Sequence, residues 1–315
     1  MTAKRVALGA LIVIGAWALA VALAEPLGDD GDSDSARLRP SAVTPDLGTA
    51  PSAKNRFAVR PARRPTAVRV RLRRPPRAGL LFDVRTGEVL WQLHPRRRLA
   101  IASLTKMMTA LVIARRHTLG ERVLITPAAL AYSGSGVGVL PKGKRVRLEA
   151  LLDGLLLVSG NDAAIALAQH DARTVARFAG RMNSTAQQLG LTCSRFSSPS
   201  GIRDEGNYSC PLDLATLARL DLAQRAVRRI VGTKRIRLRF PVKGGFLDLF
   251  NINPFIDDPG VTGVKTGLTD AAGRCYVITA KLGGRHLGVV LLNSPDPLRQ
   301  VPRLMRAGAR STASG

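Results

Sequence analysis

The sequence predicts an α+β domain built from an antiparallel sheet with flanking helices. Strand-like apolar segments occur just after residue 79 and again after residue 234, and helical patterns dominate the region between them. Two groups of strands separated by helices indicate an α+β fold and disfavour a repeating β-α-β unit. The length of about 230 residues from Gly79 onward fits one domain, and a hydrophobic content of 45% is enough to form a core.

The expected elements can be placed in chain order. Two apolar runs around the turn Arg85–Glu88 predict a β-hairpin over residues 80–91. Helical patterns follow at three places: 103–117, 148–158 and 162–189, the last with a break near Gly180. Strand patterns return at four places: 234–242, 260–266, 275–282 and 286–292. Gly283 and Gly284 predict a tight hairpin between the last two strands, and residues 298–309 predict a closing helix.

The N-terminus has the features of an export signal. Lys4 and Arg5 precede an uncharged apolar run over residues 6–24, which ends in Ala22-Leu23-Ala24. This pattern is typical of a secretory signal peptide with its cleavage site. The run is also close to the ~20 residues that span a bilayer, so an uncleaved N-terminal anchor is the alternative. In either case we expect the rest of the chain to be extracytoplasmic.

Residues 25–78 are predicted to form a disordered linker rich in proline and arginine, and residues 311–315 a short tail. The linker has no sustained apolar period, although the alternation in residues 68–73 could also form a short edge strand. The chain carries a formal net charge of +26, and basic residues are concentrated between Lys54 and Arg77. Such charge favours a polyanionic partner. With an export signal, the expected partner is an anionic membrane or cell-wall polymer and not nucleic acid.

Three cysteines are compatible with export, because two can form a disulfide outside the cytoplasm. Cys193 and Cys210 flank a loop-like stretch, and we predict that they pair. Cys275 lies inside an apolar strand-like run, where a small buried side chain is expected.

The first candidate catalytic pattern is Ser103-Leu104-Thr105-Lys106 at the start of the first helix. Residues three apart share one helical face, so the Lys106 amine can reach the Ser103 hydroxyl. A serine needs an adjacent base to attack a carbonyl, and a buried lysine can have a pKa low enough to act as one. This pattern alone is weak, because a capped surface helix would produce it too.

Two further polar patterns follow. Ser159-Gly160-Asn161 comes directly after an apolar helical run, and Lys265-Thr266-Gly267 comes at the end of a strand-like run. The first can present a hydroxyl and an amide to a cleft, and an ordinary turn is its alternative reading. The second combines a cation and a hydroxyl that suit a carboxylate, with a glycine that lets a substrate approach the backbone.

The three patterns together, in this order, resemble the penicillin-binding proteins and serine β-lactamases. The segments around them extend the likeness: residues 102–111, 155–164 and 263–273 closely resemble low-molecular-weight penicillin-binding D-alanyl-D-alanine carboxypeptidases. The resemblance covers roughly residues 79–309. It implies a β-lactamase/transpeptidase-like fold, with an all-helical subdomain beside the sheet. It also implies a peptidoglycan stem peptide as substrate and β-lactam antibiotics as covalent inhibitors.

The resemblance implies catalytic roles for three side chains. Ser103 would attack the carbonyl between two terminal D-alanines, Lys106 would act as its base, and Ser159 would relay a proton to the leaving amine. Water would then release the acyl-enzyme.

It also implies a set of substrate-binding groups. Asn161 would bind the substrate amide, and Lys265 and Thr266 its terminal carboxylate. Gly267 would allow close approach, and the backbone N–H of Leu268 would bind the oxyanion with that of Ser103.

Some positions depart from the family pattern. Leu268 stands where relatives often have an aromatic residue or histidine. Relatives commonly have an arginine near the chain end that assists carboxylate binding, and Arg299 is a candidate for it. Many relatives also have a second β domain and a C-terminal anchor. Because this sequence stops at Gly315, we expect both to be missing here and any membrane tether to be N-terminal.

Two other functions remain as alternatives. A serine β-lactamase needs a carboxylate that activates water, and Glu205, the only glutamate between Asn161 and Lys265, lacks that sequence context. A non-catalytic basic protein that binds the cell envelope would not need the intact catalytic patterns.

No cofactor is expected, because Arg145 occupies the position where a phosphate-binding loop needs serine or threonine. No metal is expected either, because the four histidines and three cysteines lack metal-binding spacing.

Overall fold

The computed structural model describes residues 55–61, 68–202 and 205–311. The predicted signal segment 1–24, residues 25–54 of the linker and residues 312–315 of the tail lie outside the described residues. Among the described residues, no helix has the length and apolar character needed to cross a membrane.

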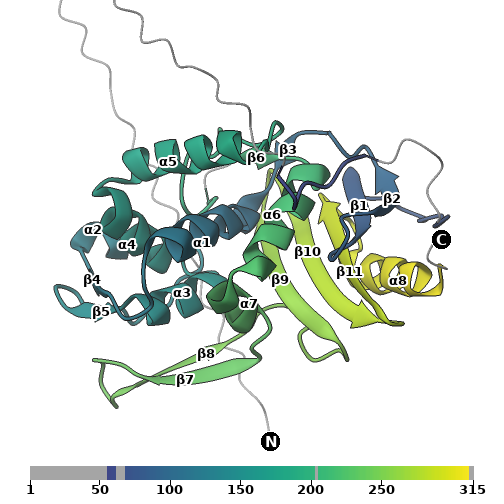
Figure 1. Cartoon of the computed structure of the whole chain (residues 1–315). Coiled ribbons are helices and arrows are strands. Elements are labelled where there is room, and N and C mark those ends of the chain that lie inside the picture. The colour runs from purple at the N-terminus through teal and green to yellow at the C-terminus, as the bar shows by residue number, and fades with distance from the viewer. Residues whose placement is uncertain (1–54, 62–67, 203–204, 312–315) are drawn as a thin grey trace, which may run out of the picture. The chain divides into compact units, whose positions relative to one another are not determined.

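A five-stranded antiparallel sheet forms one side of the domain (Figure 1). Its strands, in spatial order, are β2 (Val89–Leu93), β1 (Ala78–Asp83), β11 (Arg285–Leu292), β10 (Gly273–Leu282) and β9 (Val261–Thr269). The predicted β10–β11 hairpin is present, with Leu282 paired to Arg285. Gly283 and Gly284 both have positive φ angles, which a two-residue hairpin of this kind requires. Strand β9 is an edge of the sheet, and it is the strand that carries the Lys265-Thr266-Gly267 pattern.

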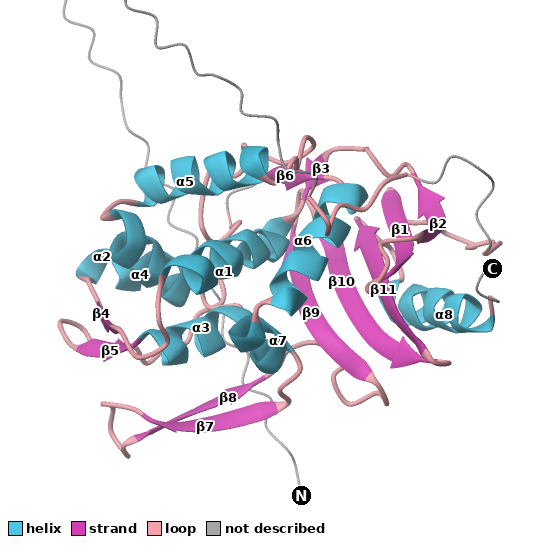
Figure 2. Ribbon diagram, in the orientation of Figure 1, coloured by secondary structure: helices cyan, strands magenta, loops and turns pink. Residues whose placement is uncertain are grey.

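Helices cover both faces of the sheet (Figure 2). The C-terminal helix α8 (Pro297–Arg310) packs on one face, where Val301, Leu304 and Met305 join the apolar side chains of β1 and β11. Helix α6 (Pro211–Ala223) packs on the other face and contacts β1 and β11. This arrangement confirms the predicted α+β class.

The remaining helices form a second, helical part beside the sheet (Figure 1). They are α1 (Thr105–Arg116), α2 (Pro127–Leu130), α3 (Leu148–Leu157), α4 (Asn161–Ala172), α5 (Val175–Gln188) and α7 (Arg225–Val231). Three two-stranded ribbons complete the described structure: β3 (Leu99–Ala100) with β6 (Tyr208–Ser209), β4 (Arg122–Leu124) with β5 (Arg145–Arg147), and β7 (Arg235–Arg239) with β8 (Phe246–Phe250).

The helical region differs from the prediction in the position of the break in the long helix and in the presence of helices α2, α6 and α7. The break in the long helix lies at Arg173 and Thr174, where the Thr174 hydroxyl accepts a hydrogen bond from the Arg177 amide and caps α5, whereas Gly180 lies inside that helix. Helix α6 was not predicted. Residues 211–222 are buried on every side, so the segment lacks the polar face that makes a helical period visible.

Part of the predicted linker is folded onto the domain, so the prediction of disorder for residues 25–78 is wrong for 55–61 and 68–78. The Arg219 guanidinium donates to the carbonyl oxygens of Phe57 and Val84. Val68 is buried, and its amide donates to the carbonyl of Leu90. In the alternating residues 69–73, the side chains of Val70 and Leu72 pack against the sheet and the three arginines are exposed to solvent. The segment forms no β-strand. These segments are therefore ordered by tertiary contacts, which their charged, proline-rich composition does not indicate.

The cysteine prediction is confirmed. Cys193 and Cys210 form a disulfide, with their Cα atoms 5.6 Å apart. Cys275 is buried in β10, outside this disulfide.

Candidate active site

Ser103 lies in a 3-10 turn, Ala102–Leu104, that leads directly into α1. The preceding residue, Ala102, has a φ of 48°, in a region that non-glycine residues rarely occupy. Gly201 lies against this turn so closely that a Cβ atom there would collide with the Ala102 carbonyl oxygen. The turn therefore depends on a glycine from a distant loop, and strain of this type is frequent at functional sites.

Lys106 points back along α1 toward Ser103, as the three-residue spacing predicts. Its Nζ atom lies 2.9 Å from Ser103 Oγ, 2.7 Å from Asn161 Oδ1 and 2.8 Å from the Ser200 carbonyl oxygen. The Lys106 side chain is completely buried. The structure therefore brings the first two patterns, and Ser200 from a separate loop, together around one amine.

Burial governs the electrostatics of the two lysines. Burial lowers the pKa of Lys106 well below its ordinary value, the positive charge of Lys265 lowers it further, and the Asp162 carboxylate acts in the opposite direction. Burial also lowers the pKa of Lys265, to about 7. A lysine with a depressed pKa has a neutral amine available to accept a proton.

Ser159 and Asn161 are held at the start of α4 by the loop 133–138. The Ser133 carbonyl accepts from Asn161 Nδ2 at 2.6 Å, and the Asn161 amide donates to the Ser135 carbonyl at 2.8 Å. Ser135 Oγ in turn donates to the Ser159 carbonyl at 2.8 Å. Ser159 has a φ of 60°, and its buried hydroxyl makes no hydrogen bond within the described structure. That hydroxyl is therefore available to a ligand.

The third pattern borders the same site from the edge strand β9. Lys265 is buried and donates to the Thr266 carbonyl at 2.9 Å. Gly267 packs against the 3-10 turn that carries Ser103, because a Cβ atom on Gly267 would lie 2.9 Å from the Ser103 amide nitrogen. The Leu268 side chain, by contrast, is 67% exposed.

A pocket of about 220 Å³ opens between these elements. It is lined by Ser103, Ser135, Ser159, Ile252, Thr266, Gly267, Leu268, Arg274 and Tyr276. None of these lining residues is an aspartate or glutamate. Buried Lys106, Asn161 and Lys265 lie behind the lining and reach it through their contacts with Ser103, the loop 133–138 and Thr266.

Sequence reasoning missed Arg274 and Tyr276. Their strand β10 pairs with β9 so that Arg274 is opposite Leu268 and Tyr276 is opposite Thr266. The two-residue period of a strand could have placed them on the site's side once the pairing was known. Arg299, the arginine proposed from the sequence, lies outside this pocket: its side chain is 89% exposed on α8, near Asp296.

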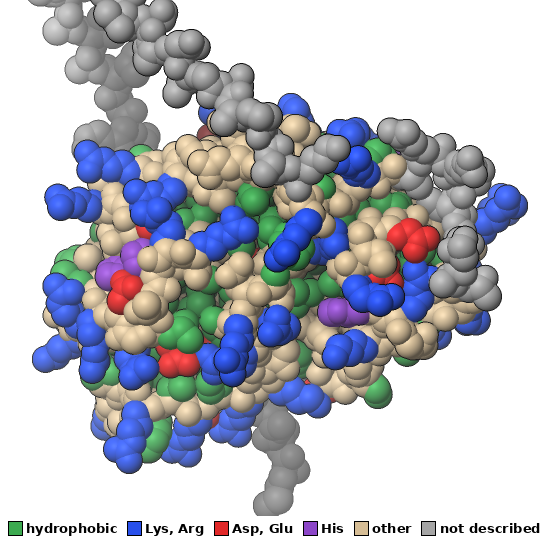
Figure 3. Space-filling view, viewed as in Figure 1, with side chains coloured by type: hydrophobic (Ala, Val, Ile, Leu, Met, Phe, Trp, Pro, Cys, Tyr) green, Lys and Arg blue, Asp and Glu red, His purple; other side chains and the backbone are tan. Residues whose placement is uncertain are grey.

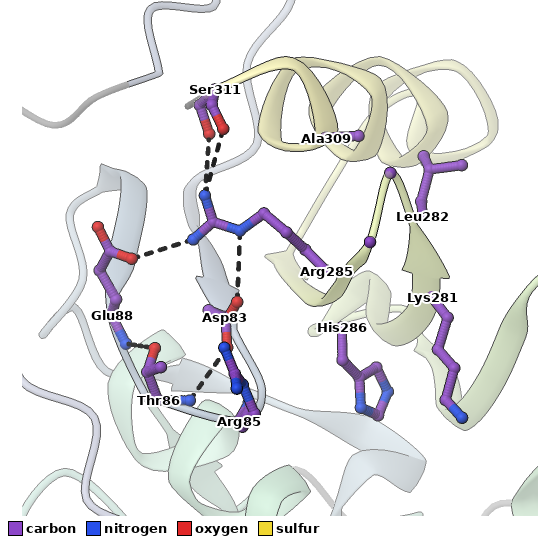
Figure 4. A pocket seen from close by; sticks show the side chains of 12 residues that line it. Asp83, Arg85, Thr86, Glu88, Lys281, Leu282, Arg285, His286, Ala309 and Ser311 are labelled. Carbon is purple, nitrogen blue, oxygen red and sulfur yellow. Dashed lines mark hydrogen bonds and ion pairs between the residues drawn. The ribbon is translucent and has the colours of Figure 1, made fainter. Parts of the chain in front are cut away.

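A larger hollow of about 950 Å³ lies between the β1–β2 turn, the β10–β11 hairpin and the end of α8 (Figure 4). Its centre is occupied by an ion-pair network, in which Arg285 donates to Asp83 and Glu88. Asp83 also accepts from the Arg85 and Thr86 amides. The carboxylates of Asp83 and Glu88 in this hollow are thus already paired with Arg285. None of the three candidate catalytic patterns lies in it.

Comparison with known proteins agrees with this geometry. The family model of Peptidase_S11, D-alanyl-D-alanine carboxypeptidase, matches residues 75–296. D-alanyl-D-alanine carboxypeptidase DacF of Bacillus subtilis is 33% identical over 227 residues, which are 70% of this chain and 58% of that protein. D-alanyl-D-alanine carboxypeptidase of Streptomyces sp. K15 is 33% identical over 240 residues, 70% of this chain and 82% of that protein.

The fold of the chain also resembles that of solved structures. The Streptomyces K15 DD-transpeptidase has a TM-score of 0.71 at 31% identity, covering 76% of this chain and 99% of that one. A D-alanyl-D-alanine carboxypeptidase from Mycobacterium tuberculosis has a TM-score of 0.73 at 28% identity, covering 78% and 96%. The chain spans a little under three fifths of DacF. With the family model matching most of its length, the chain belongs to the D-alanyl-D-alanine carboxypeptidase family.

Proposed function

We propose that this protein is a serine D-alanyl-D-alanine carboxypeptidase, which removes the terminal D-alanine from peptidoglycan stem peptides through an acyl-enzyme on Ser103. The observation that carries the proposal is the contact of 2.9 Å between Ser103 Oγ and the buried Lys106 amine. The Lys106 amine can accept the proton of the Ser103 hydroxyl, because the lowered pKa of Lys106 makes its neutral form accessible.

The surroundings of the amine favour its action as a base. A neutral amine has two N–H bonds and one lone pair. The oxygens of Asn161 and Ser200, at 2.7 and 2.8 Å, can accept both N–H bonds. The lone pair is then left for the third neighbour, the Ser103 hydroxyl, which donates its proton as Oγ attacks the substrate carbonyl.

The backbone next to Ser103 supports a site for the developing oxyanion. We assign this role to the amides of Ser103 and Leu268, because Gly267 packs against the Ser103 amide and Leu268 lines the same pocket. Backbone N–H groups that converge on one point stabilise a tetrahedral intermediate. Such a role requires no particular side chain at Leu268, so the departure from the usual residue is compatible with activity.

The remaining polar groups are assigned to the substrate. Ser159, whose hydroxyl has no partner within the described protein, would pass a proton to the leaving amine. Asn161 would bind the substrate amide after exchanging its contact with Ser133. Lys265 and Thr266 would bind the terminal carboxylate, and Gly267 keeps β9 open to the substrate backbone.

Arg274 is a further group for the carboxylate, because it lines the pocket opposite Leu268. We predict that Arg274→Gln raises the KM for a D-alanyl-D-alanine peptide about 10-fold, the scale of one lost charge-assisted hydrogen bond. Steady-state kinetics measures this value. Arg299→Gln is the matched control, since it removes an arginine outside the pocket. A larger increase of KM in the control would refute the assignment.

Labelling with fluorescent penicillin followed by peptide mapping tests the whole proposal. The expected result is a stoichiometric label on Ser103 that is released slowly, together with release of D-alanine from a stem peptide. Slow release is expected because the opened β-lactam keeps its leaving nitrogen tethered near the ester, and no carboxylate side chain lines the pocket to activate water. Rapid turnover of penicillin would favour a β-lactamase, and absence of any label would favour a non-catalytic envelope protein.

We also propose that the enzyme acts outside the cytoplasm, secreted or anchored through residues 1–24, with its basic linker on an anionic membrane or wall polymer. The exposed arginines 60, 69, 71 and 73 support the second part. Lysine and arginine side chains are also spread over the face in Figure 3, so these arginines, which lie in segments packed on the domain, would add to its positive charge.

A further inference from the structure

Two histidines and a glutamate meet where the C-terminal ends of two helices lie side by side. His117 follows α1 directly, Glu121 lies four residues later, and His170 is in the last turn of α4. The ligand atoms of these three side chains all lie within 4.8 Å of one another. The sequence analysis predicted no metal from histidine spacing, because the two histidines are far apart in the chain.

Glu121 is held with one oxygen toward both imidazole rings. Its Oε1 atom accepts from the Thr118 amide at 2.6 Å. Its Oε2 atom lies 2.8 Å from His117 Nδ1 and 2.9 Å from His170 Nε2. One carboxylate oxygen therefore faces both rings, while the other is held by the backbone.

The second nitrogen of His117 has its own carboxylate partner. His117 Nε2 lies 2.9 Å from Asp171 Oδ1, and the completely buried Asp171 carboxylate also accepts from Arg116 and Arg181. With its proton on Nε2, a neutral His117 ring presents a lone pair at Nδ1 to Glu121. A carboxylate that orients a ligating histidine through its other nitrogen is a recurrent feature of zinc sites.

The contacts between the two imidazole rings and Glu121 favour a bound cation. Two ring nitrogens face one carboxylate oxygen, and each contact needs a positive hydrogen between two electron-rich atoms. A single divalent cation can replace both protons by accepting the three lone pairs. In the ion pairs made by these side chains, the carboxylates of Glu121 and Asp171 are balanced by the guanidinium groups of Arg116 and Arg181, so with neutral histidines the group carries no net charge that would repel a cation.

We propose that His117 Nδ1, His170 Nε2 and the Glu121 carboxylate bind a Zn²⁺ ion, with water as the fourth ligand. Zinc ligand distances of about 2.0–2.1 Å in a tetrahedron require ligand atoms about 3.3 Å apart. The present contacts of 2.8 and 2.9 Å need to open by about 0.4–0.5 Å. The three side chains are 16%, 22% and 33% exposed, in the order His117, His170, Glu121, so an ion can enter from solvent.

The ion would join α1 to α4 far from the pocket. Lys106 and Asn161 lie at the N-terminal ends of these two helices, and α1 has 12 residues, a length of about 18 Å. The zinc would therefore act as a structural clamp on the two helices that carry the base and its amide partner, and not as a catalytic metal.

Titration of the chelator-treated full chain with Zn²⁺, against a chromophoric competitor at neutral pH, tests the site. The wild type is expected to bind one equivalent, and His170→Gln and His117→Gln are expected to lose that binding. Asp171→Asn should weaken it about 10–100-fold, as for other groups that orient a ligand. His94→Asn is the matched control, because it removes a histidine outside the cluster and asparagine tolerates the φ of 45° there.

Thermal unfolding gives a second measurement on the same proteins. Saturating Zn²⁺ should raise the Tm of the wild type and of His94→Asn but not that of His170→Gln, because only a native site binds the ion. A wild type that binds no Zn²⁺, or a His170→Gln variant that binds as tightly as the wild type, would overturn the proposal. Neither result depends on the peptidase activity.

Discussion

Ser103→Ala is expected to abolish covalent labelling by penicillin and to lower the release of D-alanine at least about 10⁴-fold, the scale seen when a nucleophile is removed. The physical reason is that no other serine of the pocket has a base beside it. Within the described structure, Ser159 and Ser135 also line the pocket, but the hydroxyl in contact with the Lys106 amine is that of Ser103. Labelling and peptide mapping by mass spectrometry measure the first effect, and an assay of free D-alanine the second.

Ser159→Ala is the informative comparison for this experiment. It removes a second pocket hydroxyl while leaving the Ser103 and Lys106 pair intact, so labelling should become slower but still reach one equivalent. If Ser103→Ala retained a label, another residue would be the nucleophile and the proposed mechanism would be wrong.

Lys106→Ala is expected to slow acylation by about 10²–10⁴-fold, the usual contribution of a general base. The Ser103 hydroxyl would then lack a proton acceptor, and the oxygens of Asn161 and Ser200 would lose a shared donor. In the wild type, acylation should rise with pH as Lys106 loses its proton. Since burial lowers the pKa of this lysine, the acylation rate should increase at a pH well below the one at which an ordinary lysine loses its proton. Stopped-flow acylation across pH measures both effects.

A double variant separates this role from a general loss of structure. If Ser103 and Lys106 act as one unit, replacing both should cost about as much as replacing Ser103 alone. Lys281→Ala, which removes an exposed lysine of β10, should acylate at the wild-type rate. A Lys106→Ala variant that acylates normally at neutral pH would remove the base from the mechanism.

The contacts within the first candidate catalytic pattern could be predicted without a structure, because they depend on local helix geometry. Ser103 and Lys106 are three residues apart, and one turn of helix brings them into contact. The fold class was readable for a similar reason, since the strands of the β10–β11 hairpin and the helices α1 and α3 have clear periods. The disulfide between Cys193 and Cys210 followed from a loop between two cysteines in an exported chain.

Other features were decided only by contacts between distant segments. Helix α6 has no solvent face, so its pattern could not be distinguished from other apolar segments. The 55–61 and 68–78 segments look like a charged linker until Arg219 and the β1–β2 hairpin order them.

The catalytic environment depends equally on tertiary structure. The sequence by itself determined the family and the three candidate catalytic patterns, because each pattern is a short run of residues that can be recognised without knowing its neighbours in space. Only the folded chain decided that Arg274 and not Arg299 lines the pocket, because strand register sets which side chains face it. The fold also set the pKa of Lys106, through burial and the charge of Lys265 more than 150 residues away. Burial and register are properties of the assembled domain, and no local stretch of sequence contains them.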